Sequence, residues 1–230
     1  MLQRQGIRVE SVGKLHYRAE EDPAGLDAEH LSMHVVGGCG VVWASIRDPC
    51  ISQPGGRRML GQTIGAGESS YTRYDAAVTQ RSMAWLQQVG RQPEQPFVLY
   101  VGRVAPHFPL LAPRAFSDLY PPHRLPQPKL HPDTGYVRHP WVQACADFSQ
   151  NEASFHSADE RLAAFSADCG LCSGTDHEMC RVLAALREAG LEDSTTVVYT
   201  SDHGDNLGAR GLWGKSTLYQ ESVSVPMLLA

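Results

Sequence analysis

The sequence predicts an α/β fold in which a mixed central sheet lies between helices. Two short apolar runs, 97–102 (FVLYVG) and 196–200 (TVVYT), have the composition of buried strands, and each is followed by polar loop residues. Apolar residues at helical spacing precede each run. Helices that alternate with buried strands in this way are typical of α/β proteins.

The composition sets limits on the class of protein. The chain has 230 residues, of which 42% are hydrophobic and 20% charged, which is enough for one sizeable core. A formal net charge of −5 argues against nucleic acid as a partner. No apolar run approaches the ~18 residues that a membrane span needs, and the start, MLQRQGIRVE, lacks the apolar stretch of a secretory signal. We therefore expect a cytoplasmic protein without a membrane partner.

The cysteines point to reduced thiols. Six of them are scattered through a chain too large to need disulfide bonds. Three of them, with His177, form the spacing C-x2-C-x4-H-x2-C at 169–180. This segment runs into a helical pattern that uses such positions for packing, so a structural zinc site is the weaker interpretation.

Residues 1–70 are expected to form a loop-rich insertion with edge strands, and 71–230 the α/β domain. Alternating polar and apolar residues at 7–12 predict one strand of an edge hairpin. The stretch 31–67 is rich in glycine and proline, which predicts a long loop bordering a substrate.

The first helix of the domain is predicted at 74–89, with Asp75 as its N-cap and Gly90 at its end. The strand at 97–102 follows, and then a loop in which two prolines flank His107. Because this loop leaves the carboxyl end of a strand, we expect the imidazole to face a ligand.

The remaining elements alternate between irregular and helical stretches. Frequent prolines in 109–140 predict an irregular surface excursion. Helices are predicted at 141–148 and from about 158 to 189, the latter leading into strand 196–200 as half of a parallel βαβ unit. A last strand at 226–230 would stop midway, so we expect a chain cut short at its C-terminus.

Candidate functional residues gather after strand 196–200. Asp202 and His203 would offer a divalent cation one hard oxygen ligand and one nitrogen ligand. Lys215, together with His107, would bring positive charge and hydrogen-bond donors to an anion held by that cation. Two other interpretations are open: Asp-His-Gly-Asp as an ordinary polar turn, and all these residues as packed structural side chains.

Three ordered motifs carry a resemblance to a known family. They are Gln95-Pro96-Phe97 leading to Pro106-His107-Phe108-Pro109, Asp176-His177 before Leu183, and Ser201-Asp202-His203-Gly204 followed by Gly211, Lys215, Tyr219, Glu221, Ser222 and Pro226. With these motifs, residues from about 71 to 230 resemble the sulfatase family of the alkaline phosphatase superfamily. The resemblance implies an alkaline phosphatase-like α/β sandwich, truncated at both ends.

The resemblance also implies roles for the candidate residues. Asp202 and His203 would be two ligands of a divalent metal, with Ca²⁺ expected first and Mn²⁺ or Mg²⁺ as alternatives. His107 and Lys215 would bind the oxygens of a sulfate ester and assist the leaving group. The substrate would be a small anionic ester, and the chain could form a homo-oligomer.

The chain departs from the family at the nucleophile. That residue is a Cys or Ser in the pattern C/S-x-P-x-R, which the chain lacks; at Ser52-Gln53-Pro54 the arginine comes one residue late. We therefore expect an incomplete sulfatase-type hydrolase of sulfate esters. A phosphonate monoester or phosphodiester hydrolase and a catalytically inactive sulfatase-like fragment stay open, so the sequence does not decide whether this chain alone is an enzyme.

Overall fold

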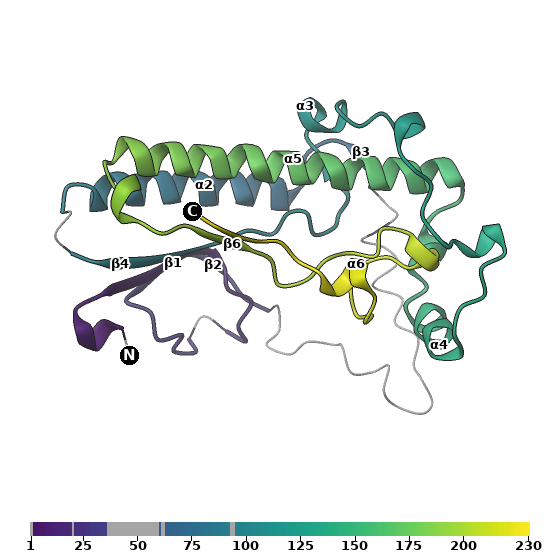
Figure 1. Ribbon diagram of the computed structural model, residues 1–230, viewed down its shortest axis with the longest axis horizontal. Helices are drawn as coiled ribbons and strands as arrows, with labels where there is room; N and C mark the ends of the chain where they lie inside the picture. Colours follow the sequence, from purple (N-terminus) through teal and green to yellow (C-terminus); the bar gives the residue numbers. More distant parts are fainter. Residues whose placement is uncertain (1, 20, 36–59, 61–62, 93–94) are drawn as a thin grey trace. The chain divides into compact units, whose positions relative to one another are not determined.

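The computed structural model describes residues 2–19, 21–35, 60, 63–92 and 95–230 (Figure 1). The chain divides into two compact units. The first unit comprises 1–41, 68–106 and 172–195, and the second comprises 42–67, 107–171 and 196–230. The predicted boundary after residue 70 stays a prediction. The predicted substrate loop and the Ser52 segment fall largely outside the described residues.

The first unit contains a parallel sheet and helices. Its elements are η1 (Gln3–Gln5), β1 (Arg8–Lys14), β2 (Ala28–Met33), α2 (Ser70–Val89), β4 (Phe97–Gly102), the C-terminal part of α5 (Ala158–Glu188) and η7 (Glu192–Ser194). The strand order is β2-β1-β4, and both pairings are parallel. β1 therefore lies in the middle of the sheet, and the prediction of an edge hairpin near the N-terminus is wrong. The alternation at 7–12 indicates a strand, but it carries no information on how many partners the strand has.

Two glycines lie where β1 and β4 end side by side. Gly13 is paired with Gly102 in the parallel register. A Cβ atom added to Gly13 would meet the carbonyl oxygen of Gly102 at 2.0 Å, and one added to Gly102 would meet that of Lys14 at 2.0 Å. Gly13 also has a φ of 102°, which L-residues rarely adopt. Only residues without a side chain fit this point of the sheet.

Helix α2 packs against β1 and β4. It starts earlier than predicted, because Ser69 is the N-cap and forms a capping box with Thr72. Asp75 is therefore not a cap; it lies inside the helix and is buried. Its two carboxylate oxygens accept hydrogen bonds from the backbone N–H groups of Val104 at 2.9 Å and Ala105 at 2.8 Å. Asp75 thus fixes the backbone that follows β4.

β4 has the predicted bounds but not the predicted burial. Alternate residues, Val98 and Tyr100, are 42% and 52% exposed. Phe97 on the other face packs edge-on against the buried ring of Trp85 of α2, with ring centroids 5.2 Å apart. In the described part of the chain β4 is an edge strand with one face against α2, and so its apolar run is only half covered.

The second unit contains short strands, short helices and the N-terminal part of α5. Its other elements are β3 (Gly65–Ala66), β5 (Leu111–Ala112), α3 (Arg114–Ser117), η4 (Pro122–Arg124), η5 (Pro132–Thr134), α4 (Pro140–Ser149), η6 (Asn151–Ser154), β6 (Val198–Thr200), η8 (Ala209–Gly211), α6 (Gln220–Val223) and β7 (Met227–Leu229). The proline-rich excursion, the helix after it and the long helix are confirmed. No helix within the described ranges combines the length and the apolar character that a membrane crossing requires.

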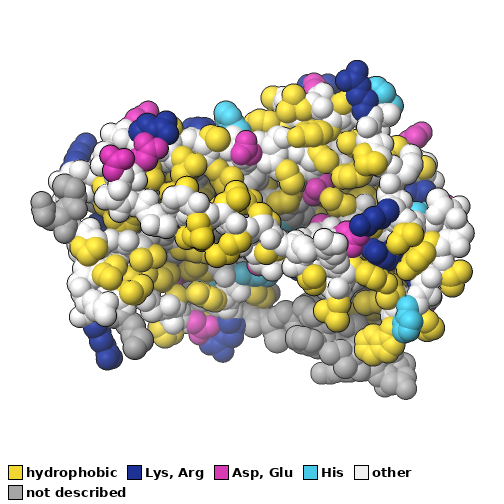
Figure 2. Space-filling view, in the orientation of Figure 1, with side chains coloured by type: hydrophobic (Ala, Val, Ile, Leu, Met, Phe, Trp, Pro, Cys, Tyr) yellow, Lys and Arg dark blue, Asp and Glu magenta, His cyan; other side chains and the backbone are white. Residues whose placement is uncertain are grey.

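β6 and β7 form an antiparallel pair, with Val198 opposite Leu229. The parallel partner predicted for β6 is not among its pairings in the described part of the chain. β6 is also shorter than predicted and is not buried: Val198 is 55% exposed, and the three residues of β7 are 62–68% exposed. Hydrophobic side chains gather on the face of the molecule where β6 and β7 run (Figure 2).

Candidate active site

The turn after β6 brings the predicted metal ligands to the surface of the second unit. Ser201 Oγ donates a hydrogen bond to the His203 carbonyl at 3.0 Å, and the His203 backbone N–H donates to Asp202 Oδ1 at 3.1 Å. Gly204 N–H donates to the Ser222 carbonyl at 2.8 Å, and a Cβ on Gly204 would meet the Glu221 carbonyl oxygen at 2.1 Å. The sequence Ser-Asp-His-Gly therefore folds into a tight turn held against α6.

The imidazole of His203 connects the other candidates. Its Nδ1 lies 2.8 Å from the Gly204 carbonyl oxygen. A carbonyl can only accept, so we assign the proton to Nδ1, which leaves a lone pair on Nε2. Lys215 Nζ lies 2.6 Å from this Nε2 and donates to it. Asp202 Oδ2 lies 3.6 Å from the same nitrogen. Asp202 and Lys215 thus both lie beside the imidazole of His203.

The loop between His203 and Lys215 is closed by the side chains of Asp205 and Asn206. Asp205 Oδ1 accepts from the N–H groups of Leu207 and Gly214, both at 2.9 Å. Asn206, which is fully buried, donates its backbone N–H and its Nδ2 to the Gly214 carbonyl at 2.9 and 2.6 Å. These bonds fold the loop back on itself. They return the chain to the Asp-His turn just before Lys215.

A second carboxylate lies near this loop. Burial raises the pKa of Asp168, on α5, well above its ordinary value, and the charge of Asp205 raises it further. Burial also raises the pKa of Asp205, although the N–H groups of Leu207 and Gly214 act in the opposite direction. Asp168 therefore holds its proton to a higher pH than an exposed aspartate does. Asp168 could not be singled out from the sequence, because one acidic residue in a long helical pattern gives no signal of its environment.

His107 belongs to the same unit and lies in the loop after β4. Its Nδ1 is 2.9 Å from the Phe108 carbonyl oxygen, and its ring is tilted against that of Phe108 at a centroid distance of 4.2 Å. The peptide bonds before Pro106 and Pro109 are both cis. The position of His107 beside the other candidate residues stays a prediction.

In the first unit, taken by itself, two polar residues occupy a position that follows from the central place of β1. β1 ends at Lys14, and His16 follows with a φ of 61°. Both therefore follow the carboxyl end of the central parallel strand, the position at which α/β proteins bind ligands. The signal was present in the sequence as an alternating strand that ends in Gly-Lys-x-His. Its meaning depended on the strand being central rather than at an edge.

The two candidate metal ligands, Asp202 and His203, would supply only part of a coordination shell. Among the residues that the structure describes, no three His, Cys, Asp or Glu side chains lie close enough together to hold a metal ion. The two donors Asp202 Oδ2 and His203 Nε2 are 3.6 Å apart. Two atoms bound to one ion at about 2.0–2.4 Å are separated by roughly 3–4 Å, so this pair fits a shared ion if Lys215 moves aside.

Comparisons with known proteins place the chain in one family. The model of the family described as Sulfatase matches residues 1–230. The multifunctional alkaline phosphatase superfamily protein PehA of Trinickia caryophylli is 31% identical over 162 residues, which cover 66% of this chain and 31% of that protein. The choline-sulfatase of Rhizobium meliloti (strain 1021) is 27% identical over 244 residues, which cover 100% of this chain and 46% of that protein.

Solved structures show the same fold. The phosphonate monoester hydrolase of Agrobacterium radiobacter superposes with a TM-score of 0.67 at 20% identity, over 99% of this chain and 51% of that one. The phosphonate monoester hydrolase SpPMH from Silicibacter pomeroyi gives a TM-score of 0.62 at 20% identity, over 100% and 51%. The chain thus spans about half or less of the length of these relatives. Its α/β fold is that of the alkaline phosphatase-like sulfatases. The chain belongs to the sulfatase family.

Proposed function

We propose that this chain forms part of the active site of a sulfatase-type hydrolase that acts on sulfate esters with a divalent metal. The observation that carries the proposal is the convergence of an acidic, an imidazole and an ammonium group on one turn. Lys215 Nζ is 2.6 Å from His203 Nε2, and Asp202 Oδ2 is 3.6 Å from the same atom. Membership of the sulfatase family supports it.

In this proposal Asp202 and His203 hold the metal. The Nδ1–H of His203 donates to the Gly204 carbonyl, which keeps the ring oriented and its Nε2 lone pair available for coordination. Asp202 is 65% exposed, so its carboxylate is accessible to an ion from solvent. A bound divalent cation would supply Lewis-acid polarisation of an ester oxygen. Ca²⁺ is the first candidate, with Mn²⁺ and Mg²⁺ as alternatives.

Lys215 and His107 would bind the ester itself. The Lys215 ammonium would pair with an oxygen of the sulfate group and offset the charge that builds up there during hydrolysis. His107 would donate to the leaving-group oxygen. The substrate class is therefore a small anionic ester, and the sulfate is the part that these residues would recognise.

A second activity is favoured by particular relatives. The chain resembles in fold two phosphonate monoester hydrolases, and one sequence relative is named multifunctional. Tetrahedral sulfate, phosphonate and phosphodiester groups place anionic oxygens alike, so Lys215 and His107 would serve all three. A third alternative is an inactive chain, because its 230 residues contain no C/S-x-P-x-R nucleophile pattern.

A metal titration combined with a substrate panel tests the proposal. Calorimetry of the full chain with Ca²⁺, Mn²⁺ and Mg²⁺ should detect binding that weakens at least about tenfold in Asp202→Asn and His203→Ala. Asp193→Asn, an exposed aspartate of η7, is the matched control and should bind as wild type does. Equal metal affinity in all four proteins would remove Asp202 and His203 from the site.

Hydrolysis is measured separately with an aryl sulfate, an aryl phosphonate monoester and an aryl phosphodiester. Turnover of the sulfate above background supports the sulfatase assignment. Turnover of the phosphonate or phosphodiester without the sulfate supports the second activity. Metal binding without any turnover supports the inactive chain, since the residues that hold the ion and the nucleophile are separate parts of the site.

A further inference from the structure

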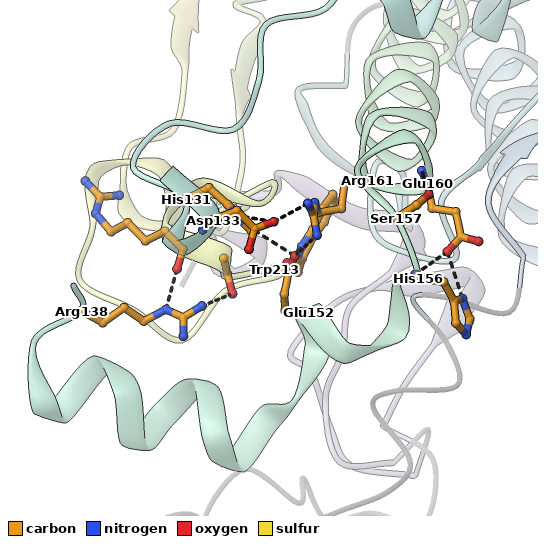
Figure 3. Close-up of polar contacts among 11 residues, drawn as sticks. His131, Asp133, Arg138, Glu152, His156, Ser157, Glu160, Arg161 and Trp213 are labelled. Carbon is orange, nitrogen blue, oxygen red and sulfur yellow. Dashed lines mark hydrogen bonds and ion pairs between the residues drawn. The ribbon is translucent and has the colours of Figure 1, made fainter. Parts of the chain in front are cut away.

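The backbone segment that leads to Lys215 is held in place by Trp213, two residues before it. Trp213 is 3% exposed, and its Nε1–H donates to Glu152 Oε2 at 2.7 Å (Figure 3). Its ring packs against Phe155 with a centroid distance of 4.4 Å, and its carbonyl accepts from Asn151 Nδ2 at 3.2 Å. Three neighbouring residues of one segment thus hold both the side chain and the backbone of Trp213.

Glu152 is itself fixed by donors from two other segments. Its Oε1 accepts from His131 Nε2 at 2.9 Å and from Arg161 Nη1, on α5, at 3.0 Å. Arg161 in turn reaches Asp133 Oδ2 through Nη2 at 2.7 Å. Figure 3 shows these side chains pointing toward one another from the proline-rich excursion, α5 and the loop that carries Trp213. The carboxylate therefore joins three parts of the second unit that are far apart in sequence.

The proline-rich excursion, residues 109–140, also contacts the loop that carries Trp213 at a second point. Arg138 donates from Nε to the Arg210 carbonyl at 2.6 Å and from Nη2 to the Gly211 carbonyl at 3.1 Å. The residue between Trp213 and Lys215 is Gly214, with a φ of 73°. A glycine there gives the backbone little stiffness of its own, so the position of Lys215 depends on the contacts on either side of it.

We infer that Glu152 is a positioning residue for Lys215, acting through the indole N–H of Trp213. If the carboxylate is lost, this N–H is left in a buried place without its acceptor, and the indole must shift to find another. The shift would pass through Gly214 and move the ammonium away from His203. The inference rests on the proposed function in one respect: Lys215 is taken as the group that meets the anionic ester.

Lysine acylation measures this position without any activity. The chain has only three lysines, Lys14, Lys129 and Lys215, so peptide mass spectrometry with N-acetoxysuccinimide gives each rate, and two of them serve as internal references. In the wild type, the Lys215 amine is held against His203 Nε2 at 2.6 Å, and this contact hinders its acylation. Glu152→Ala should raise the Lys215 rate about threefold to tenfold relative to Lys14 and Lys129.

Two further variants make the result decisive. Trp213→Phe removes the indole N–H but keeps an aromatic ring against Phe155, and it should raise the Lys215 rate in the same selective way. Glu152→Gln keeps an oxygen that can accept from Trp213 Nε1 and should hold the Lys215 rate near that of the wild type. The matched control is Glu160→Ala, which removes a glutamate that also contacts a histidine, His156 at 3.1 Å, but not Trp213 (Figure 3). It should leave all three rates unchanged.

A Lys215 rate that stays at the wild-type ratio in Trp213→Phe overturns the inference. If Glu152→Ala unfolds the protein, all three lysines react faster together, and Trp213→Phe then decides. The acylation rates are measured without metal or substrate. Absent hydrolysis therefore contradicts only the proposed function, and an unchanged Lys215 ratio in Trp213→Phe contradicts only this inference.

Discussion

Lys215 Nζ and His203 Nε2 lie 2.6 Å apart, and the bond between them occupies the lone pair through which His203 would bind a metal. The carbonyl of Gly204 holds the other ring nitrogen, so the ring has no second nitrogen to offer a cation. In the proposed site a lysine ammonium and a divalent ion would therefore compete for one atom. Metal binding would then move Lys215 toward solvent or toward the anion.

The competition predicts that Lys215→Met binds Mn²⁺ more tightly than the wild type. Removing the ammonium frees the Nε2 lone pair and removes a like charge, and a hydrogen bond from a charged donor corresponds to roughly tenfold in affinity. Calorimetric titration of the full chain measures the change. Lys129→Met removes a charge elsewhere in the same unit and should leave the affinity unaltered; equal affinities for Lys215→Met and wild type would refute the competition.

Asp75→Ala should lower the free energy of unfolding by about 2–4 kcal/mol. The change leaves the N–H groups of Val104 and Ala105 without the carboxylate that accepts from both of them. Urea denaturation followed by circular dichroism gives the value. Arg73→Ala, at an exposed position of the same helix, should stay within about 0.5 kcal/mol of wild type. A loss for Asp75→Ala no larger than that would show that the buried carboxylate is not what fixes the backbone after β4.

The ion pairs of Glu221 predict that the protein loses stability in acid. The hydrogen bond from Lys129 lowers the pKa of its carboxyl from 4.5 to about 2, with Arg210 contributing in the same direction and burial opposing. Lys129 Nζ lies 2.5 Å from Glu221 Oε1, and Arg210 Nη1 lies 3.1 Å from Oε2. Because the folded pKa is depressed, the stabilisation is complete above pH 4.5 and is lost as the pH falls toward about 2.

Lys129→Met isolates this contribution. Without Lys129 the folded pKa of Glu221 lies closer to its ordinary value, so the variant has less stability to lose in acid. The difference in unfolding free energy between wild type and variant should be largest at about pH 6 and should shrink toward pH 3. Denaturant titrations at several pH values measure it. A difference that is constant across this range would mean that the ion pair does not set the titration of Glu221.

The sequence predicted those features that depend on neighbouring residues. The bounds of β4 and the extent of α5 follow from local runs and periodicity. Asp75 was misread as a cap because Ser69 and Thr72 form a capping box without the usual Glu or Gln at its third position. The central place of β1 could not be predicted, because the alternation in a strand does not show how many strands flank it.

In the candidate site, too, some residues could be predicted from the sequence and others could not. Asp202, His203 and Lys215 lie in one loop, so a strand followed by a polar turn and a family motif sufficed to single them out. Glu152 and Trp213 are brought together by the fold alone, and a glutamate in a polar turn carries no sign of a partner 61 residues away. Such contacts between distant segments require the structure.

The close approach of Gly13 and Gly102 has a consequence for how this protein tolerates mutation. A single methyl group on either residue would push apart two main chains that now touch, although neither glycine carries any chemistry. A saturation screen should therefore find both positions as intolerant as a reactive residue. A position in this chain that tolerates no substitution is therefore not by itself a sign of catalysis. Glycines at close backbone contacts have to be set aside before a map of inactivating substitutions is used to locate reacting groups.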